Sequence, residues 1–272
     1  MPDVRAIFLD LDGTLLNAEG RISEPTRRAL EACHRRGILL YVATARSRRL
    51  APRADEAGTL TAILSERGLC HNGAMAWDAP LGYERHYVLA ADTVAALTRD
   101  LAQVDADLQI AVQRGEEYNA YRLPMSAAEH ETWGFAPHEA PAFAWAAGRA
   151  CSKIVALHPS RDLGEAFATL SHRYAGRAAL YLTDSRRCLQ AMACGVGKER
   201  AAADLLAARG IAMDEAAAFG DDAPDAALLA AVGHGVAMGN ATPAARQAAR
   251  HMTRRHDEDG VAYGLEHILG LV

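Results

Sequence analysis

Short apolar runs alternate with segments of helical spacing over the first third of the chain. Three apolar runs have the length of buried strands, and they lie at 5–9, 38–43 and 62–64. Two segments with helical character separate them, at 24–36 and 47–57. In the first of these, Ala29, Leu30 and Cys33 form an apolar stripe, and Gly37 ends the helix. This alternation of strand and helix is typical of parallel βαβ units.

The pattern becomes less regular in the middle of the chain. Asn72-Gly73 is a turn signal, and the two apolar runs that follow it have the spacing of a hairpin. These two runs lie at 74–77 and 86–89. Helices are expected at 92–103 and 163–174, and strands at 108–112, 117–121, 151–158 and 179–182. The aromatic stretch 133–145 fits neither period, so no element is assigned to it.

The regular alternation returns after residue 187. Strands are expected at 189–193, 216–219 and 235–238, and helices at 198–209, 225–232, 243–250 and 261–269. An α/β sheet interrupted by an insertion explains this order better than two consecutive domains. We therefore predict an α/β fold, with a Rossmann-like core of parallel sheet formed by 1–85 and 187–272 and an inserted α+β domain formed by 86–186.

Composition and charge narrow the function classes. Half of the 272 residues are apolar and 23% are charged, which is typical of a globular protein. A net charge of -5 argues against broad nucleic-acid binding, and no apolar run approaches the roughly 20 residues that cross a bilayer. The five cysteines contain no CxxC pair, as expected of reduced thiols. With a first strand at residue 5 and no secretory segment before it, we expect a cytoplasmic protein.

Two carboxylates, Asp10 and Asp12, stand one residue apart where the first expected strand ends. Side chains at i and i+2 of an extended segment project to the same side, and ligands of α/β sheets bind at the carboxyl ends of the strands. One carboxylate could therefore act as a nucleophile or metal ligand and the other as a proton donor. Gly13 lets the backbone turn there, with its amide free to approach an anion. An ordinary Asp-Gly turn is the plain structural alternative.

Further polar groups follow other expected strands. Thr44 and Arg46 could hold a phosphoryl group by hydrogen bonds and charge, and Lys198 begins a helix whose amides favour an anion. A third set follows the strand 216–219, and it consists of Asp221, Asp222 and Asp225. Carboxylates with one lysine suit a hard divalent cation plus a phosphate, and Mg2+ is the default for an oxygen-only site. Each group alone could be a helix cap or a solvated side chain, but their joint occurrence favours chemistry.

Together these motifs resemble those of the haloacid dehalogenase superfamily, and specifically the Cof-type sugar-phosphate phosphatases with a large α/β cap of type IIB. The resemblance covers about 4–80 and 187–270, whereas the cap is matched in position and size only. The segments that carry it are Asp10-Leu11-Asp12-Gly13-Thr14-Leu15-Leu16, Ala43-Thr44-Ala45-Arg46, Asn72-Gly73-Ala74, Gly195-Val196-Gly197-Lys198, Phe219-Gly220-Asp221, Met238-Gly239-Asn240-Ala241 and Asp257-Glu258-Asp259-Gly260-Val261-Ala262.

The resemblance implies roles for individual residues. Asp10 would attack phosphorus to form an aspartyl-phosphate, and Asp12 would act as general acid and then as general base. Thr44 and Lys198 would hold the phosphoryl oxygens, and the inserted cap would close over the site. Mg2+ would be bound by Asp10, the backbone carbonyl of Asp12 and Asp221, with Asp222 and Asp225 as further candidate ligands. The candidate substrate-binding residues are Gly13, Arg46, Asn72, Gly73 and Asn240.

Two positions depart from the family pattern. Pro224 stands where the family usually has asparagine, and proline offers neither a side-chain amide nor a backbone N–H. Asp222 is the nearest candidate to replace the missing hydrogen bond. Ala45 stands in place of the usual glycine, which is a milder change. Both departures bear on catalytic efficiency more than on the class of reaction.

The expected function is that of a Mg2+-dependent phosphoric monoester hydrolase acting on small phosphorylated metabolites such as sugar phosphates. A mannosyl-3-phosphoglycerate or sucrose-phosphate phosphatase, or a phosphomannomutase, is the alternative within the same architecture. A non-catalytic phosphate-binding module is the alternative from another class, and Pro224 keeps it open. The expected partner is a phosphorylated small molecule rather than nucleic acid or membrane, and the chain is expected to be a monomer or a weak homodimer.

Overall fold

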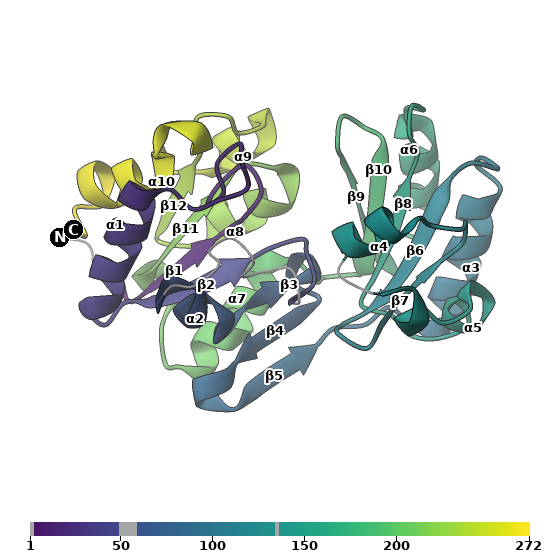
Figure 1. The fold of residues 1–272 in the computed structure, drawn as a ribbon, viewed down its shortest axis with the longest axis horizontal. Coiled ribbons are helices and arrows are strands. Elements are labelled where there is room, and N and C mark those ends of the chain that lie inside the picture. Colours follow the sequence, from purple (N-terminus) through teal and green to yellow (C-terminus); the bar gives the residue numbers. More distant parts are fainter. Residues whose placement is uncertain (1–2, 49–58, 134–135) are drawn as a thin grey trace. The chain divides into compact units, whose positions relative to one another are not determined.

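A computed structural model describes residues 3–48, 59–133 and 136–272, and the chain in it divides into two units (Figure 1). Met1–Arg85 and Gly197–Val272 form the first, called the core unit below. His86–Val196 form the second, the inserted unit. Each unit has its own sheet and its own hydrophobic cluster. In the part of the chain that is described, no helix combines the length and apolarity needed to span a bilayer.

The core unit is built on an eight-stranded sheet in the order β13-β12-β11-β1-β2-β3-β4-β5. Its strands are β1 (Ala6–Leu9), β2 (Leu39–Ala43), β3 (Arg67–Cys70), β4 (Met75–Asp78), β5 (Tyr83–His86), β11 (Ala216–Gly220), β12 (His234–Ala237) and β13 (His251–Met252). The strands from β13 to β3 in this order are parallel, and β4 runs antiparallel to β3. Because Leu9 is in register with both Val42 and Phe219, the loops after β1, β2 and β11 begin side by side.

Helices and short helical turns surround this sheet. They are α1 (Glu24–Arg35), α2 (Thr59–Ser65), η2 (His71–Gly73), η3 (Ala79–Leu81), α7 (Lys198–Ala208), η5 (Met213–Glu215), η6 (Ala223–Asp225), α8 (Ala226–Ala231), α9 (Pro243–Ala248), η7 (His256–Glu258), α10 (Gly260–Tyr263) and η8 (Gly264–Ile268). Helix α1 begins where the Ser23 side chain accepts from the Thr26 amide, with proline in the first turn. Its apolar stripe contains Leu30 and Cys33, which are fully buried.

Both faces of the core sheet are packed. Ile7 and Leu9 of β1 join Leu30 of α1 and Leu265 of η8 in one hydrophobic cluster. Successive side chains of a strand point to opposite faces, so Phe8 lies on the other side. There it stacks on Tyr41 of β2 with ring centroids 4.9 Å apart. A sheet buried on both faces explains why these strands read as continuous apolar runs.

The inserted unit is a five-stranded antiparallel sheet in the order β7-β6-β8-β10-β9. Its strands are β6 (Gln109–Arg114), β7 (Tyr118–Tyr121), β8 (Lys153–Leu157), β9 (Ala178–Thr183) and β10 (Cys188–Ala193), and its helices are α3 (Ala91–Ala102), α4 (Ala127–Trp133), η4 (Pro137–Glu139), α5 (Phe143–Ala147) and α6 (Gly164–Arg173). Val94 of α3 and Leu170 of α6 share one cluster with Ile110 and Ile154 of the sheet.

The predicted α/β fold class is confirmed, but several details of the sequence interpretation were wrong. Strand β3 was not expected, and the second hairpin strand is β5 at Tyr83–His86 rather than at 86–89. Residues 62–64 belong to helix α2, because Leu60, Ile63 and Leu64 share one helical face that buries into the core. The strand expected at 189–193 is β10, which pairs with β8 and β9 of the inserted unit, so that unit ends at Val196 rather than at residue 186. The two-residue strand β13 was not expected at all. Most of the helix expected at 47–57 lies outside the described residues.

Gly68 of β3 is a position where the core sheet has no space for a side chain. A Cβ atom there would lie 2.7 Å from the carbonyl oxygen of Val42 and 2.7 Å from Cη2 of Trp77. We predict that Gly68→Ala lowers the free energy of unfolding by about 1–3 kcal/mol, the usual cost of overpacking. Gly148→Ala is the matched control, since its nearest neighbours would lie 3.9 Å away. Urea denaturation of both variants measures the difference, and equal stability of the two would contradict the packing described here.

Candidate active site

Three polar side chains follow the carboxyl ends of adjacent parallel strands in the core unit. Asp10 follows β1, Thr44 follows β2, and Asp221 follows β11. The Asp10 amide donates to the carbonyl of Phe219 at 3.1 Å, which continues the pairing of β1 with β11 by one residue. Asp10 and Thr44 are buried. The sheet topology therefore brings together residues that are more than 200 positions apart in the sequence.

Lys198 is the first residue of α7, and its ammonium group lies among these carboxylates. Its Nζ donates to Oδ1 of Asp10 at 2.8 Å and to Oδ1 of Asp225 at 2.5 Å, with only 2% of the lysine side chain exposed. Burial opposes the positive charge, but the two facing carboxylates outweigh it and hold the pKa of Lys198 above its ordinary value. Lys198 is therefore a fixed cation next to Asp10 at neutral pH.

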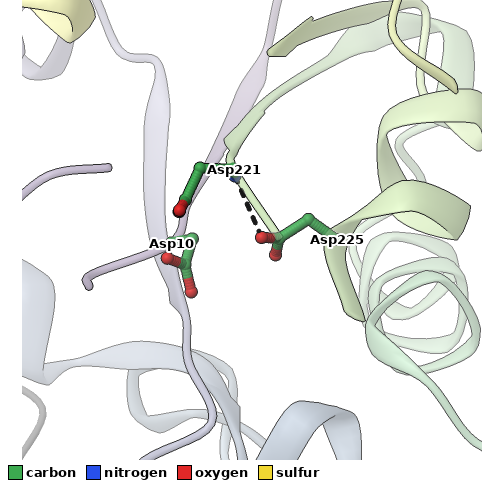
Figure 2. A group of neighbouring side chains, drawn as sticks. All are labelled: Asp10, Asp221 and Asp225. Atoms are coloured by element: carbon green, nitrogen blue, oxygen red, sulfur yellow. Dashed lines mark hydrogen bonds between the residues drawn. The ribbon is translucent and has the colours of Figure 1, made fainter. Parts of the chain in front are cut away.

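Asp10, Asp221 and Asp225 form an acidic group whose ligand oxygens lie within 4.8 Å of one another (Figure 2). Burial raises the pKa of Asp10 well above its ordinary value and raises the pKa of Asp221 to about 6, and neighbouring carboxylates add to both shifts. Three carboxylates around one lysine leave an excess of negative charge. An oxygen-only set with this excess suits a hard divalent cation.

Asp225 supports the loop after β11. Its Oδ2 accepts from the amides of Asp221 at 3.1 Å and Asp222 at 3.0 Å, while its Oδ1 accepts from Lys198. Pro224 sits in the first turn of η6, where no backbone donor is needed, and the Asp222 side chain accepts from the Ala223 amide at 2.8 Å. The loop is thus closed by carboxylates on either side of the proline.

Asp221 is oriented by two other loops. The Thr14 hydroxyl donates to Oδ1 of Asp221 at 2.8 Å, and Nδ2 of Asn240 lies 3.4 Å from its Oδ2. The same Asn240 amide donates to the carbonyl of Gly13 at 2.8 Å. Asn240, expected from the sequence to bind substrate, is therefore bonded to the loop after β1 and to Asp221. Thr14 was missed as a site residue, although it lies in the first motif.

His256 is a further residue that the sequence did not single out. Its amide donates to Oδ1 of Asn240 at 3.1 Å, and its ring Nδ1 lies 2.8 Å from the carbonyl oxygen of Leu16. His256 therefore connects the segment before α10 to Asn240, which contacts Asp221, and to Leu16 in the loop after β1. The only sequence signal was the adjoining motif at 257–262, which marked the segment but not the histidine.

Asp12 is paired with Arg46 rather than with the acidic group. Nε of Arg46 donates to Oδ2 of Asp12 at 2.7 Å, and Nη2 donates to Oδ1 in the same fork. The Asp12 side chain is 57% exposed, in contrast to the buried Asp10. The Arg46 amide in turn donates to the hydroxyl of Thr44 at 3.0 Å. The loops after β1 and β2 therefore meet through one bidentate ion pair.

The turn at 71–73 packs against the start of α7. His71 and Asn72 are buried and have positive φ angles of 50° and 56°, and the Asn72 amide donates to the carbonyl of Thr44 at 3.0 Å. Gly73 has a φ of 95°, and a Cβ there would lie 2.9 Å from the backbone nitrogen of Lys198. Only glycine fits this close approach without displacing α7. Strained, buried backbone of this kind is common at functional sites.

A comparison of the sequence with known protein families gives a result that agrees with this geometry. The family model described as haloacid dehalogenase-like hydrolase matches residues 7–265. The chain belongs to the haloacid dehalogenase-like hydrolases. The family and the fold class that the sequence motifs indicated are thereby confirmed.

Relatives and solved structures extend over nearly the whole chain. The 5-amino-6-(5-phospho-D-ribitylamino)uracil phosphatase YcsE of Bacillus subtilis is 25% identical, covering 97% of this chain and 96% of the relative. The HMP-PP phosphatase of Yersinia enterocolitica is 29% identical, covering 97% and 95%. A haloacid dehalogenase-like hydrolase from Bacteroides thetaiotaomicron has a TM-score of 0.80 at 26% identity, covering 97% and 99%.

The same fold is found in a sugar phosphatase of haloacid dehalogenase subclass IIB. That structure has a TM-score of 0.83 at 22% identity and covers 99% of this chain and 100% of its own. At this identity the likeness concerns the fold, a Rossmann-like core with an inserted cap domain. The family match makes the chain a hydrolase of the haloacid dehalogenase type, and the curated relatives above are named as phosphatases.

The raised pKa of Asp221 makes the stability of the metal-free protein depend on pH. Below about pH 4 the Asp221 carboxyl is protonated in both the folded and unfolded states, so its ionisation does not change the free energy of unfolding there. As pH rises to about 6, the unfolded state ionises first, and stability falls. At pH 8 in the presence of chelator, we expect Asp221→Asn to be more stable than wild type by up to about 3 kcal/mol. This figure corresponds to a difference of roughly two pKa units between the folded and unfolded states.

Urea denaturation of wild type and Asp221→Asn at pH 4 and pH 8 measures this effect. Glu215→Gln is the control. Its side chain is partly exposed and pairs with Arg5 at 3.2 Å, so we expect this substitution to change stability by less than about 1 kcal/mol. A stability difference between Asp221→Asn and wild type that stays constant over this pH range would show that Asp221 titrates normally.

Proposed function

We propose that the chain is a Mg2+-dependent phosphatase that hydrolyses small phosphorylated metabolites through an aspartyl-phosphate at Asp10. The observation that carries the proposal is the pairing of buried Asp10 with Lys198 at 2.8 Å, beside Asp221 and at the end of β1. A carboxylate next to a fixed cation can take up a dianionic phosphoryl group, because the cation offsets part of the added charge. The exposed Asp12, two residues further on, supplies the proton chemistry.

In the first half of the reaction, a carboxylate oxygen of Asp10 attacks the phosphorus atom of the monoester. A bond forms between this oxygen and phosphorus, and the bond from phosphorus to the alcohol oxygen breaks. Asp12 gives its proton to the departing alkoxide, so the alcohol leaves neutral. Lys198 and the hydroxyl of Thr44 hold the phosphoryl oxygens and offset the charge that develops on them.

In the second half, water replaces the alcohol. Asp12, now a carboxylate, removes a proton from a water molecule as the water oxygen attacks phosphorus. The bond between phosphorus and the Asp10 oxygen breaks, which releases inorganic phosphate and restores the Asp10 carboxylate. Arg46 forms a bidentate pair with Asp12 and thereby holds the Asp12 side chain in place between the two steps.

The residues present fit a Mg2+ ion. Asp10, Asp221 and the backbone carbonyl of Asp12 are the proposed ligands. Asp225 accepts from Lys198 and from the amides of Asp221 and Asp222, so we assign it to holding the lysine and the loop. Asp222 lies outside the acidic group of the described residues, so we assign it to the loop cap instead. When bound, Mg2+ would reduce the repulsion between the site carboxylates and the phosphate. Thr14 and Asn240 orient Asp221 for this purpose.

The substrate class is proposed from the chemistry that the relatives share. They are named for a phosphorylated ribitylaminouracil, for HMP-PP and for sugar phosphates, which are all small phosphorylated compounds. A small phosphorylated metabolite, with a sugar phosphate as the first candidate, is therefore the proposed substrate. Its phosphate cannot cross a membrane unaided, so the proposed place of action is the cytoplasm.

A screen of phosphorylated metabolites separates this proposal from its alternatives. Release of inorganic phosphate from several small monoesters supports a general phosphatase. Strict preference for a mannosyl or sucrose phosphate indicates a specialised enzyme, and transfer of phosphate between sugar positions indicates a mutase. Phosphate binding without turnover would indicate a non-catalytic module.

Asp10→Asn is the direct test of the nucleophile. The amide keeps the shape of the side chain but is a poor nucleophile, so we expect turnover to fall by at least about 1,000-fold in a folded protein, which corresponds to roughly 4 kcal/mol in the barrier. Phosphate release from the best substrate of the screen measures the effect. Asp214→Asn, an exposed carboxylate of η5, is the control and is expected to retain full activity. Turnover of Asp10→Asn within a few-fold of wild type would overturn the assignment.

Removal of divalent metal is expected to abolish phosphate release, and added Mg2+ is expected to restore it. The physical reason is the excess negative charge of the acidic group, which the lysine alone does not balance. Asp221→Asn, with one ligand fewer, should require a higher Mg2+ concentration for half-maximal activity, by about tenfold or more. Undiminished activity of wild type in excess EDTA would rule out the metal role.

A further inference from the structure

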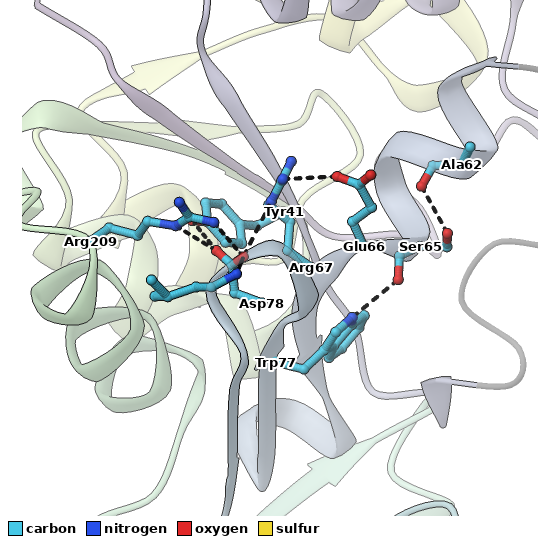
Figure 3. Close-up of polar contacts among 9 residues, drawn as sticks. Tyr41, Ala62, Ser65, Glu66, Arg67, Trp77, Asp78 and Arg209 are labelled. Carbon is cyan, nitrogen blue, oxygen red and sulfur yellow. Dashed lines mark hydrogen bonds and ion pairs between the residues drawn. The ribbon is translucent and has the colours of Figure 1, made fainter.

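A partly buried ion pair, with its carboxylate fully buried, fixes the end of α7 that lies farthest from the active site. Arg209, which caps the helix, donates from Nε to Oδ2 of Asp78 at 2.8 Å and from Nη2 to Oδ1 at 2.5 Å (Figure 3). Asp78 is completely buried at the end of β4, and its pKa is lowered because Arg209 outweighs the opposing effect of burial. A two-point fork of this kind fixes both the distance and the direction of the helix end.

Asp78 is itself held firmly by the sheet. The Tyr41 hydroxyl of β2 donates to Oδ2 of Asp78 at 3.1 Å, and the Leu81 amide donates to its Oδ1 at 3.2 Å. Arg67 of β3, directly opposite in the strand register, brings its Nε to within 3.8 Å of the carboxylate. Figure 3 shows these side chains converging on Asp78 from separate elements. The carboxylate therefore provides a fixed point in the core unit.

The apolar face of α7 fixes the position of the helix along its own axis less sharply than the ion pair at Arg209 does. Its buried apolar residues are Ala201, Ala202, Leu205 and Leu206, and the half nearest the active site contains only alanines. Alanine side chains are too short to interdigitate deeply with the neighbouring surface, so they resist sliding weakly. At the N-terminal end, Lys198 is attached to its carboxylates through a long, flexible side chain.

Stability alone gives little reason for an arginine and an aspartate at this place. Removing two charges from water costs free energy that their attraction only roughly repays, so apolar residues of similar size often serve stability equally well. The best-attested benefit of a buried ion pair is that it selects one register of packing over others. Here the register is that of α7 along β4, with Lys198 at its start.

We infer that Asp78 and Arg209 are positioning residues for the active site. By fixing the far end of α7, they set the axial position of the helix, so that Nζ of Lys198 reaches Asp10 and Asp225 together. The 11 residues of α7 span about 16 Å, and a regular helix transmits an axial displacement from one end to the other. The catalytic consequence rests on the proposed role of Lys198 in phosphoryl transfer, whereas the structural consequence does not.

The test compares Arg209→Lys, which keeps the charge but loses the fork, with Asp78→Asn. Arg67 and Tyr41 remain beside Asp78 in the first variant, so the carboxylate keeps partners and the protein is expected to fold. Arg27→Lys is the matched control, because it likewise loses a two-point fork, here onto Glu24 within α1, and its contacts do not involve α7. Hydrogen exchange followed by mass spectrometry and steady-state kinetics are measured on all three.

The deciding readout is the amide exchange of the first turn of α7. The Ala201 amide donates to the carbonyl of Gly197, about 12 Å along the helix from Arg209. We expect Arg209→Lys and Asp78→Asn to speed exchange at residues 201–203 by about tenfold, and Arg27→Lys to leave it unchanged. Faster exchange confined to residues 205–211 and to β4 would show that the ion pair acts only locally, and would overturn the inference.

Kinetics supply the catalytic consequence. With Lys198 displaced, kcat/KM should fall by about 10- to 100-fold in both variants, because misplacement by about 1 Å costs this much. Arg27→Lys should stay within about threefold of wild type. If wild type turns over no phosphomonoester, the proposed function fails, but the exchange experiment still decides the position of α7. If exchange changes as expected while kcat/KM does not, Asp78 and Arg209 are not positioning residues for catalysis.

Discussion

The burial of one ammonium group, that of Lys198, is the constraint on which the site depends. A buried lysine is tolerated only where carboxylates face it, and here Asp10 comes from β1 and Asp225 from the turn after β11. The ammonium group therefore joins two strands that are adjacent in the sheet and far apart in sequence. The position of Nζ of Lys198 depends on three features: the start of α7, the turn at 71–73 that packs against it, and the fork at Arg209.

Charge balance gives this arrangement its chemistry. Lys198 neutralises only part of the charge of Asp10, Asp221 and Asp225. The carboxyls of buried Asp10 and half-buried Asp221 are therefore hard to ionise without a further cation. Oxygen ligands, excess negative charge and a fixed lysine together suit the joint binding of a divalent cation and a phosphate. Asp12, exposed and paired with Arg46, lies outside this group and is therefore free of its charge excess.

The sequence predicted the parts of the site that follow from strand ends, and it failed where contacts depend on packing. Asp10 and Asp221 could be found because parallel strands bring their carboxyl ends to one edge. Lys198 could be found because it begins a helix, whose amides favour an anion. The hydrogen bond from Asn240 to Gly13 could not be predicted, because a short motif does not show which loop its side chains will contact. Residues 62–64 were misassigned because a three-residue apolar run has no period, and β10 because an antiparallel cap strand resembles a core strand in composition.

The central claim is that the oxygen of Asp10 carries the phosphoryl group during turnover. The most direct measurement is rapid acid quenching of wild type with its substrate, followed by borohydride reduction and peptide mass spectrometry. An aspartyl-phosphate is reduced to homoserine, whereas a free carboxylate is not. The account predicts homoserine at position 10, and only there. Homoserine at another aspartate, or unmodified Asp10 in an enzyme quenched while it accumulates a phosphorylated form, would contradict it.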